Sequence, residues 1–126
     1  YYNRFLVPPE KLIKEKCAFW MDKAAVFNAV FTDNRVLPPE FILSARITEL
    51  VCDISESGTP AAGIEINFLL IRHDTADDII LNTTIKAERI LPEFSPDILV
   101  SRYNECLEEI FLHLEKRIVT ALENQG

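Results

Sequence analysis

Three consecutive segments in the middle of this chain alternate apolar and polar residues, and no other feature constrains the fold as strongly. The segments cover residues 41–54, 62–72 and 79–87, with turn-forming residues between them. Alternation with a period of two is typical of strands in a sheet that has one covered and one more open face. Because the connections are short, we predict that the three strands pair as an antiparallel meander.

The alternation also assigns side chains to the covered face and suggests a pairing register. The predicted inward residues are Phe41, Leu43, Ala45 and Ile47, then Ala62, Ile64, Ile66, Phe68 and Leu70, then Ile79, Leu81, Thr83, Ile85 and Ala87. A register that pairs Leu70 with Leu81 brings large apolar side chains together on this face. In the same register Glu65 stands opposite Lys86 on the outward face, which is a favourable cross-strand charge pair.

A long amphipathic helix is predicted at the C-terminal end of the chain. Ser95-Pro96-Asp97 is a strong helix start, because the hydroxyl can cap the helix, proline fits the first turn and the carboxylate faces the positive end of the helix dipole. The helix can run to about residue 122, with an apolar stripe made of Leu99, Tyr103, Cys106, Leu107, Ile110, Phe111, Leu114, Ile118 and Ala121. At about 1.5 Å per residue it is roughly 40 Å long, enough to cross the whole sheet.

The N-terminal part of the chain is predicted to hold another helix between two strands. Pro8 and Pro9 end a strand at residues 1–6 and start a helix over 10–23, and residues 26–31 form an apolar interior strand. A strand, a helix and a strand in this order form a right-handed parallel crossover. The predicted fold class is therefore α/β, more strictly α+β. Residues 1–126 form a single domain, with a mixed sheet of about five strands in the order β-α-β-β-β-β-α and two helices packed on the sheet.

Charge and hydropathy argue against two classes of protein. Thirteen basic against twenty acidic residues give a formal net charge of −7, and such a surface repels the phosphate backbone of nucleic acids. Apolar runs such as residues 68–71 are far shorter than the roughly 20 residues that span a bilayer. The chain opens without the basic and apolar regions of a signal peptide. Because it starts abruptly within a predicted strand, we expect it to be a fragment of a longer protein.

No group of residues in the sequence matches a known reaction chemistry. The chain has three glycines, so a glycine-rich phosphate loop or a dinucleotide fingerprint is not possible. The remaining candidates are His73 beside Asp74, His113, Asp77-Asp78 and Glu108-Glu109. Histidines and paired acids on a hairpin loop or a helix surface usually face solvent, and we interpret all of them in this way. We therefore predict no catalytic residues, no cofactor and no metal site.

The three cysteines, Cys17, Cys52 and Cys106, are too far apart in sequence for zinc-type pairs and too few for a disulfide framework. Cys17 and Cys106 fall on the apolar faces of the two predicted helices, where thiols act as small buried hydrophobes. The alternative is a bridge between Cys17 and Cys106, which requires the two helices to lie side by side.

Two groups of apolar residues are candidates for an interface. The predicted register places Ile71 opposite Ile80 on the outward face of the sheet, and their neighbours on that face extend the group. The first group comprises Ile42, Leu69, Ile71 and Ile80. The second group, at the start of the chain, comprises Tyr1, Tyr2 and Phe5. Apolar patches often mark contacts with a partner, but another part of the same protein can also cover them.

One short motif and the order of the predicted elements resemble a known family. Residues 3–12 read Asn-Arg-Phe-Leu-Val-Pro-Pro-Glu-Lys-Leu, which resembles the segment that opens the first helix in the ABC-type transport auxiliary lipoprotein component family, the group of the paraquat-inducible lipoprotein C. Residues 24–30, 41–50, 61–70 and 99–122 are similar to the family's following strands and its closing helix. Phe5 stands where the family often carries tryptophan, and the family's lipobox and first strands are not in this sequence.

The resemblance implies a non-catalytic periplasmic subunit of an ABC-type lipid transport system. Such a lipoprotein is anchored to the outer membrane by an N-terminal lipid, which this chain does not include. It assists an ABC permease, its ATPase and an MCE-domain substrate carrier in moving lipids between membranes. We therefore expect it to act through protein–protein contacts with these components, with self-assembly into a homo-oligomer as a further option.

Two other functions fit the same design. A ligand carrier would hold an acyl chain between the long helix and the sheet, although large residues at nearly every inward position favour a filled core. An outer-membrane assembly lipoprotein of similar strand and helix design would bind a barrel protein in place of MCE-domain subunits. An enzyme is the class that the sequence supports least.

Overall fold

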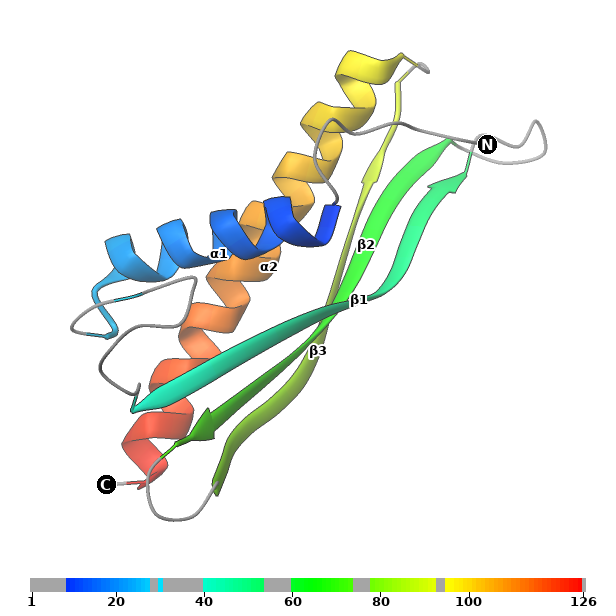
Figure 1. The fold of residues 1–126 in the computed structure, drawn as a ribbon. Helices are drawn as coiled ribbons and strands as arrows, with labels where there is room; N and C mark the ends of the chain where they lie inside the picture. The colour runs from blue at the N-terminus through cyan, green and yellow to red at the C-terminus, as the bar shows by residue number, and fades with distance from the viewer. Residues whose placement is uncertain are drawn as a thin grey trace.

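In the part of the chain that the structure describes, two helices and three strands form a two-layer α+β fold (Figure 1). The computed structural model describes residues 9–27, 30, 40–53, 60–73, 78–92 and 95–125. Along the chain the elements are α1 (Pro9–Ala24), β1 (Phe41–Asp53), β2 (Ala61–Arg72), β3 (Asp78–Ile90) and α2 (Pro96–Gln125). The strands pair antiparallel in the order β1-β2-β3, and both helices lie on one face of the sheet.

The predicted antiparallel meander and both predicted helices are confirmed, whereas a sheet of about five strands is not. The strand expected at residues 1–6 lies outside the described residues. Of the strand expected at 26–31, Val26 and Phe27 form a bend after α1 and Val30 is in no strand, while residues 28, 29 and 31 lie outside the described residues. These three side chains pack against the core. Burial in a core therefore explains part of this apolar run without strand pairing.

The long C-terminal helix begins and packs as its sequence predicts. The amide of Ile98 donates to Ser95 Oγ at 3.2 Å, and the amide of Leu99 donates to the Ser95 carbonyl at 2.9 Å. Ser95 is therefore the helix cap. The stripe is buried along the helix, and its residues Leu99, Cys106, Ile110, Leu114 and Ile118 are completely inaccessible. α2 packs mainly on β3 and also contacts β2.

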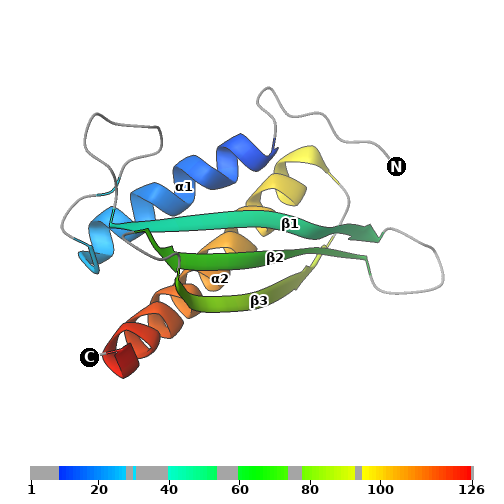
Figure 2. The same cartoon turned by 60° about the horizontal axis from the view of Figure 1, so that its bottom comes forward.

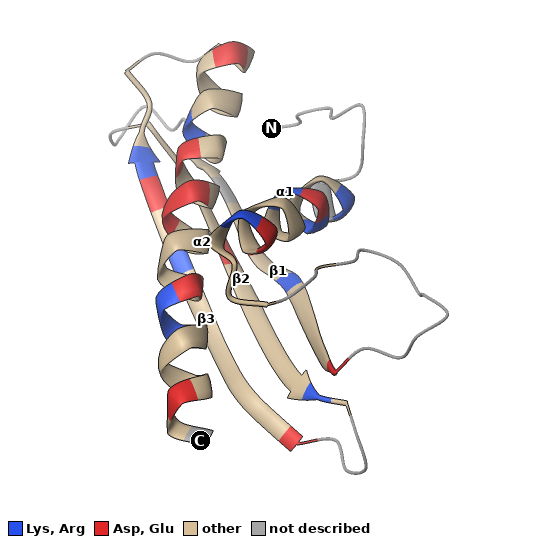
Figure 3. Cartoon of the chain, turned by 90° about the vertical axis from the view of Figure 1, so that its left-hand side faces the viewer, with Lys and Arg blue, Asp and Glu red and all other residues tan. Residues whose placement is uncertain are grey.

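α1 covers the remaining part of the same sheet face and crosses α2 (Figures 1 and 3). Ile13, Cys17 and Met21 recur at four-residue spacing and are buried against the main core. The helix ends where Ala25 adopts a left-handed conformation, with φ of 57°, which commonly stops an α-helix.

Trp20 fastens the two helices to each other. Its indole Nε1 donates to Glu115 Oε1 at 2.8 Å, and its ring lies 6.2 Å from the ring of Phe111, measured between centroids. The indole thus satisfies its polar group while its ring adds apolar contact area between the helices.

A bulge in β3 changes the predicted register at one end of the sheet. Leu70 pairs with Leu81 as predicted, but Ile71 then pairs with Ile79 and not with Ile80. One extra residue in a strand reverses the faces of the residues beyond it. Ile79, which we predicted to face inward, is therefore 64% exposed on the outward face. Ile80, predicted on the outward face, instead packs partly against the core.

Two leucines of α2 provide a test of this packing. Leu114 is completely buried in the core, whereas Leu112, on the same helix, is 41% exposed. We expect Leu114→Ala to lower the free energy of unfolding by about 2–5 kcal/mol, because it removes buried methyl groups and leaves a cavity. We expect Leu112→Ala to change it by about 0.5 kcal/mol or less. Urea unfolding followed by circular dichroism measures both values, and equal losses would contradict the packing.

Candidate functional site

One face of the sheet is left open by both helices, and it carries three zones of different chemistry. In Figure 2, α2 passes behind the strands, so that no described element covers the face opposite to it. Outward side chains of this open face include Ser44, Arg46, Asn82, Thr84 and Glu88, all of which are exposed. The zones are an apolar end, a polar middle and an end with ion pairs.

The apolar end is a cluster of four aliphatic side chains, which we call the apolar patch: Ile42, Leu69, Ile71 and Ile79. Ile71 lies at the centre, since it pairs with Ile42 of β1 on one side and with Ile79 of β3 on the other. Leu69 follows on the same face of β2. Three of the four are partly buried, and Ile79 is exposed. The structure thus brings together three predicted interface residues and replaces Ile80 with Ile79.

The middle zone consists of hydrogen-bonded amides and hydroxyls. Asn67 Nδ2 donates to Asn82 Oδ1 at 3.0 Å and to Thr84 Oγ1 at 3.0 Å. These groups satisfy one another across β2 and β3. On β1, the exposed Arg46 stands opposite Asn67, so this part of the face also carries a positive charge.

The charged end forms a short ladder of ion pairs. Glu65 stands opposite Lys86, as predicted from the register. The Lys86 ammonium group, however, contacts Glu49 Oε1 at 3.0 Å and Glu88 Oε1 at 3.3 Å, and Glu65 instead accepts a hydrogen bond from Thr48 Oγ1. The hydrogen bonds that Lys86 donates to Glu49 and Glu88 raise the pKa of Lys86, so the lysine stays charged.

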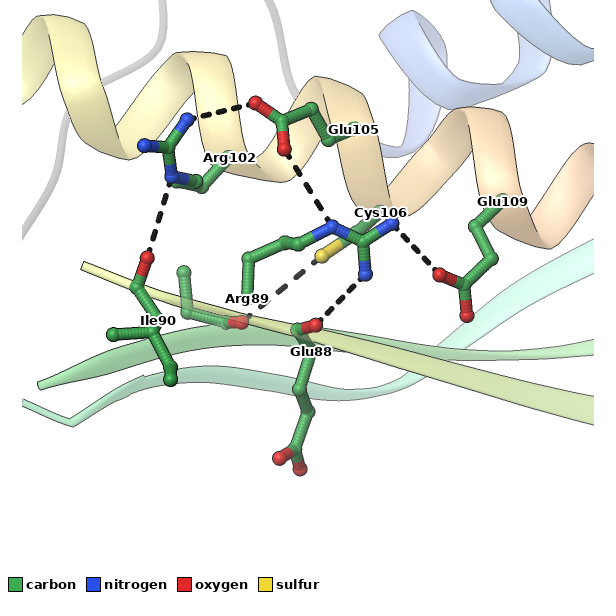
Figure 4. A network of polar contacts seen from close by, with 8 residues as sticks. Glu88, Arg89, Ile90, Arg102, Glu105, Cys106 and Glu109 are labelled. Atoms are coloured by element: carbon green, nitrogen blue, oxygen red, sulfur yellow. Dashed lines mark hydrogen bonds and ion pairs between the residues drawn. The ribbon is translucent and has the colours of Figure 1, made fainter. Parts of the chain in front are cut away.

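A second polar cluster joins α2 to β3 on the covered side of the sheet (Figure 4). Arg89 Nη2 lies 2.7 Å from Glu109 Oε1, and Arg89 Nε lies 3.5 Å from Glu105 Oε1. Arg102 Nη1 binds Glu105 Oε2 at 2.8 Å. The hydrogen bond that Arg89 donates to Glu109 raises the pKa of Arg89. Sequence reasoning missed this cluster, although Arg89 continues the inward alternation of β3 and the two acids lie four residues apart on α2.

The remaining predicted candidates do not converge in the part of the chain that the structure describes. His73, His113 and Glu108 are exposed, and Glu109 binds Arg89. Tyr1, Tyr2, Phe5, Asp74 and Asp77 lie outside the described residues. Among those described, no group of three or more His, Cys, Asp or Glu side chains could hold a metal ion. No helix within the described ranges is long and apolar enough to cross a membrane.

Two of the three cysteines are buried thiols within the core. Cys17 and Cys106 are not joined by a disulfide. Burial raises the pKa of the Cys17 thiol to about 12 and that of the Cys106 thiol to about 11. Since the thiolate is the reactive form, neither group is suited to act as a nucleophile near neutral pH.

The comparisons with known proteins define the class of fold. No protein-family model and no curated protein matches the chain. A crystal structure of a Xanthomonas campestris protein of family DUF330 is similar, with a TM-score of 0.78 and 15% identity, over 96% of this chain and 68% of that one. A hypothetical protein of Chlamydia trachomatis is similar with a TM-score of 0.52 and 16% identity, over 66% of this chain and 56% of that one. At these identities the likeness shows a shared fold.

Thiol alkylation tests the buried state of the two cysteines. We expect iodoacetamide at pH 8 to leave Cys17 and Cys106 unmodified in the folded protein and to modify both in urea. Because their folded pKa values lie above the ordinary value of 9.0, the unfolded thiols ionise first, and stability should fall as the pH rises from about 9 towards 11. Mass spectrometry of the peptides measures the labelling. Rapid modification of either residue in the folded state would contradict its burial.

Proposed function

We propose that this protein is a non-catalytic auxiliary subunit of an ABC-type, MCE-associated lipid transport system, and that it binds its partners through the open face of the sheet. The observation that carries the proposal is the apolar patch at one end of a face that no described element covers. Two further points support it. The segment at residues 3–12 resembles the auxiliary lipoprotein family, and the fold is similar to that of a DUF330 protein.

The open face has the composition of a partner-binding surface. Its apolar patch is bordered by the uncharged network of Asn67, Asn82 and Thr84, and the ion pairs of Lys86 lie farther along the strands. Interfaces commonly place apolar side chains at the centre and polar groups at the rim. A partner could thus bury the patch while the exposed Arg46, opposite Asn67, stays in water at the rim, which avoids a large desolvation cost.

The interior of the fold favours contacts with proteins over storage of an acyl chain. Phe68, Leu70, Leu107 and Phe111 fill the space between α2 and the sheet, and each is buried. The groove beside the C-terminal end of α2 is shallow and open, and is lined by Leu81, Lys116, Arg117, Thr120, Ala121 and Asn124. A filled interior leaves the surface as the place where this part of the chain acts.

The family resemblance supplies the finer parts of the proposal. The protein functions in the periplasm, is held at the outer membrane by a lipid anchor in the full-length form, and contacts an MCE-domain protein together with an ABC permease and its ATPase. The complete sheet has about five strands.

Charge substitutions in the apolar patch test the proposal. We expect Ile79→Asp and Ile71→Asp each to weaken binding to the MCE-domain subunit by about tenfold or more, because each places a carboxylate in an apolar contact. Val119→Asp, at an exposed aliphatic position of α2, is the matched control and should bind like the wild type. Binding is measured by calorimetry with purified subunits, and circular dichroism checks the fold.

Two results would refute this assignment of the open face. One is wild-type binding by both isoleucine variants. The other is unfolding of Ile71→Asp together with normal binding by Ile79→Asp, since the patch would then belong to the core of the protein.

A further inference from the structure

One side of β3 is an edge of the sheet that no described strand covers, and every second residue of β3 points its backbone N–H and C=O groups towards this edge. β3 is the last strand in the order β1-β2-β3. Just past its end, the amide of Leu91 donates to the Pro60 carbonyl at 2.8 Å, so odd-numbered residues direct their backbone groups towards β2. The register is regular from Leu81 to Ile90. The even-numbered residues from Asn82 to Ile90 therefore point their N–H and C=O groups away from the sheet.

Three arginines donate to carbonyls of this edge, and all three acceptors are even-numbered residues. Arg89 Nη1 lies 2.8 Å from the Glu88 carbonyl, and Arg102 Nε lies 3.3 Å from the Ile90 carbonyl. Arg117 Nη1 lies 3.5 Å from the Thr84 carbonyl, in a weaker contact, and also binds Thr83 Oγ1. The acceptors are thus spread along the edge.

Acidic residues of α2 hold two of these arginines in place (Figure 4). Glu105 binds Arg102 and lies close to Arg89, and Glu109 binds Arg89 more tightly. Arg117 and Arg102 are themselves residues of α2, which packs along β3. The helix therefore sets guanidinium groups against the edge of the strand beneath it.

Unpaired strand edges are templates for association with another chain. An added strand would need the outward carbonyls of β3 as hydrogen-bond acceptors, and the arginines already contact those of Thr84, Glu88 and Ile90. A second copy is the partner that the sequence of β3 fits best. In an antiparallel pair of two β3 edges centred on Ala87, Lys86 of each copy stands opposite Glu88 of the other, so the pair is self-complementary in charge.

We propose that Arg89, Arg102 and Arg117 close the edge of β3 to strand addition by a second copy of this chain. Their removal converts this edge into a site of self-association. The inference goes beyond the proposed function and does not rest on it, because it concerns the edge of the sheet and not its open face.

The triple variant Arg89→Gln/Arg102→Gln/Arg117→Gln tests the proposal, because it frees the carbonyls of Thr84, Glu88 and Ile90. We expect it to self-associate at least about tenfold more tightly than the wild type in sedimentation velocity from micromolar to millimolar concentration. The triple substitution changes the net charge from −7 to −10, so greater repulsion between copies opposes any non-specific association. Lys11→Gln/Lys14→Gln/Lys16→Gln, on exposed positions of α1, makes the same charge change and should sediment like the wild type.

A proline in the edge identifies the surface that is responsible. The N–H of Thr84 points outward, so Thr84→Pro removes a donor that only an added strand would use. We expect it to reverse the association of the arginine triple variant, with Lys86→Pro as the substitute if circular dichroism shows that Thr84→Pro does not fold. The proposal is overturned if the triple variant sediments like the wild type, since α2 alone would then shield the edge. It is also overturned if association persists with the folded proline variant.

Discussion

The structure depends on the contact between the apolar stripe of α2 and the inward face of β2 and β3. Ile110, Leu114 and Ile118 are completely buried there, together with Ile66 and Phe68 from the central strand. A three-stranded sheet needs such a cover, because a sheet with two wet faces buries too little apolar area to offset the entropy of ordering its chain. α1 completes this cover and is fastened to α2 through Trp20.

Covering one face has consequences for the other face and for the edge of the sheet. The open face keeps an order of chemistry along its strands, from the apolar patch through the amides around Asn67 to the ion pairs of Lys86. On the covered side, α2 reaches the edge of β3 and brings Arg102 and Arg117 against backbone carbonyls. The same helix that forms the core thus also determines which surfaces of the sheet remain available to a partner.

The sequence predicted the meander and most of its register, but it did not show the bulge. Ile79, Ile80 and Leu81 are three consecutive aliphatic residues, so the alternation does not show which of them face inward. In the structure the extra residue turns Ile79 outward and Ile80 inward, which completes the apolar patch with a different residue from the one expected. The apolar run at 26–31 led to the prediction of a strand for a similar reason. Val26 and Phe27 pack their side chains against the core, but they form a bend and not a strand.

The sequence by itself determined the type and order of α1, the meander and α2, because period, capping residues and turn residues act over short distances along the chain. It also determined that Cys17, Cys106 and the stripe of α2 are interior residues, since each falls on an apolar helix face. Only the tertiary structure decided which isoleucines form the patch and which acids bind Arg89. These contacts depend on a bulge and on where one helix lies across a strand, and such long-range geometry leaves no periodic trace in the chain.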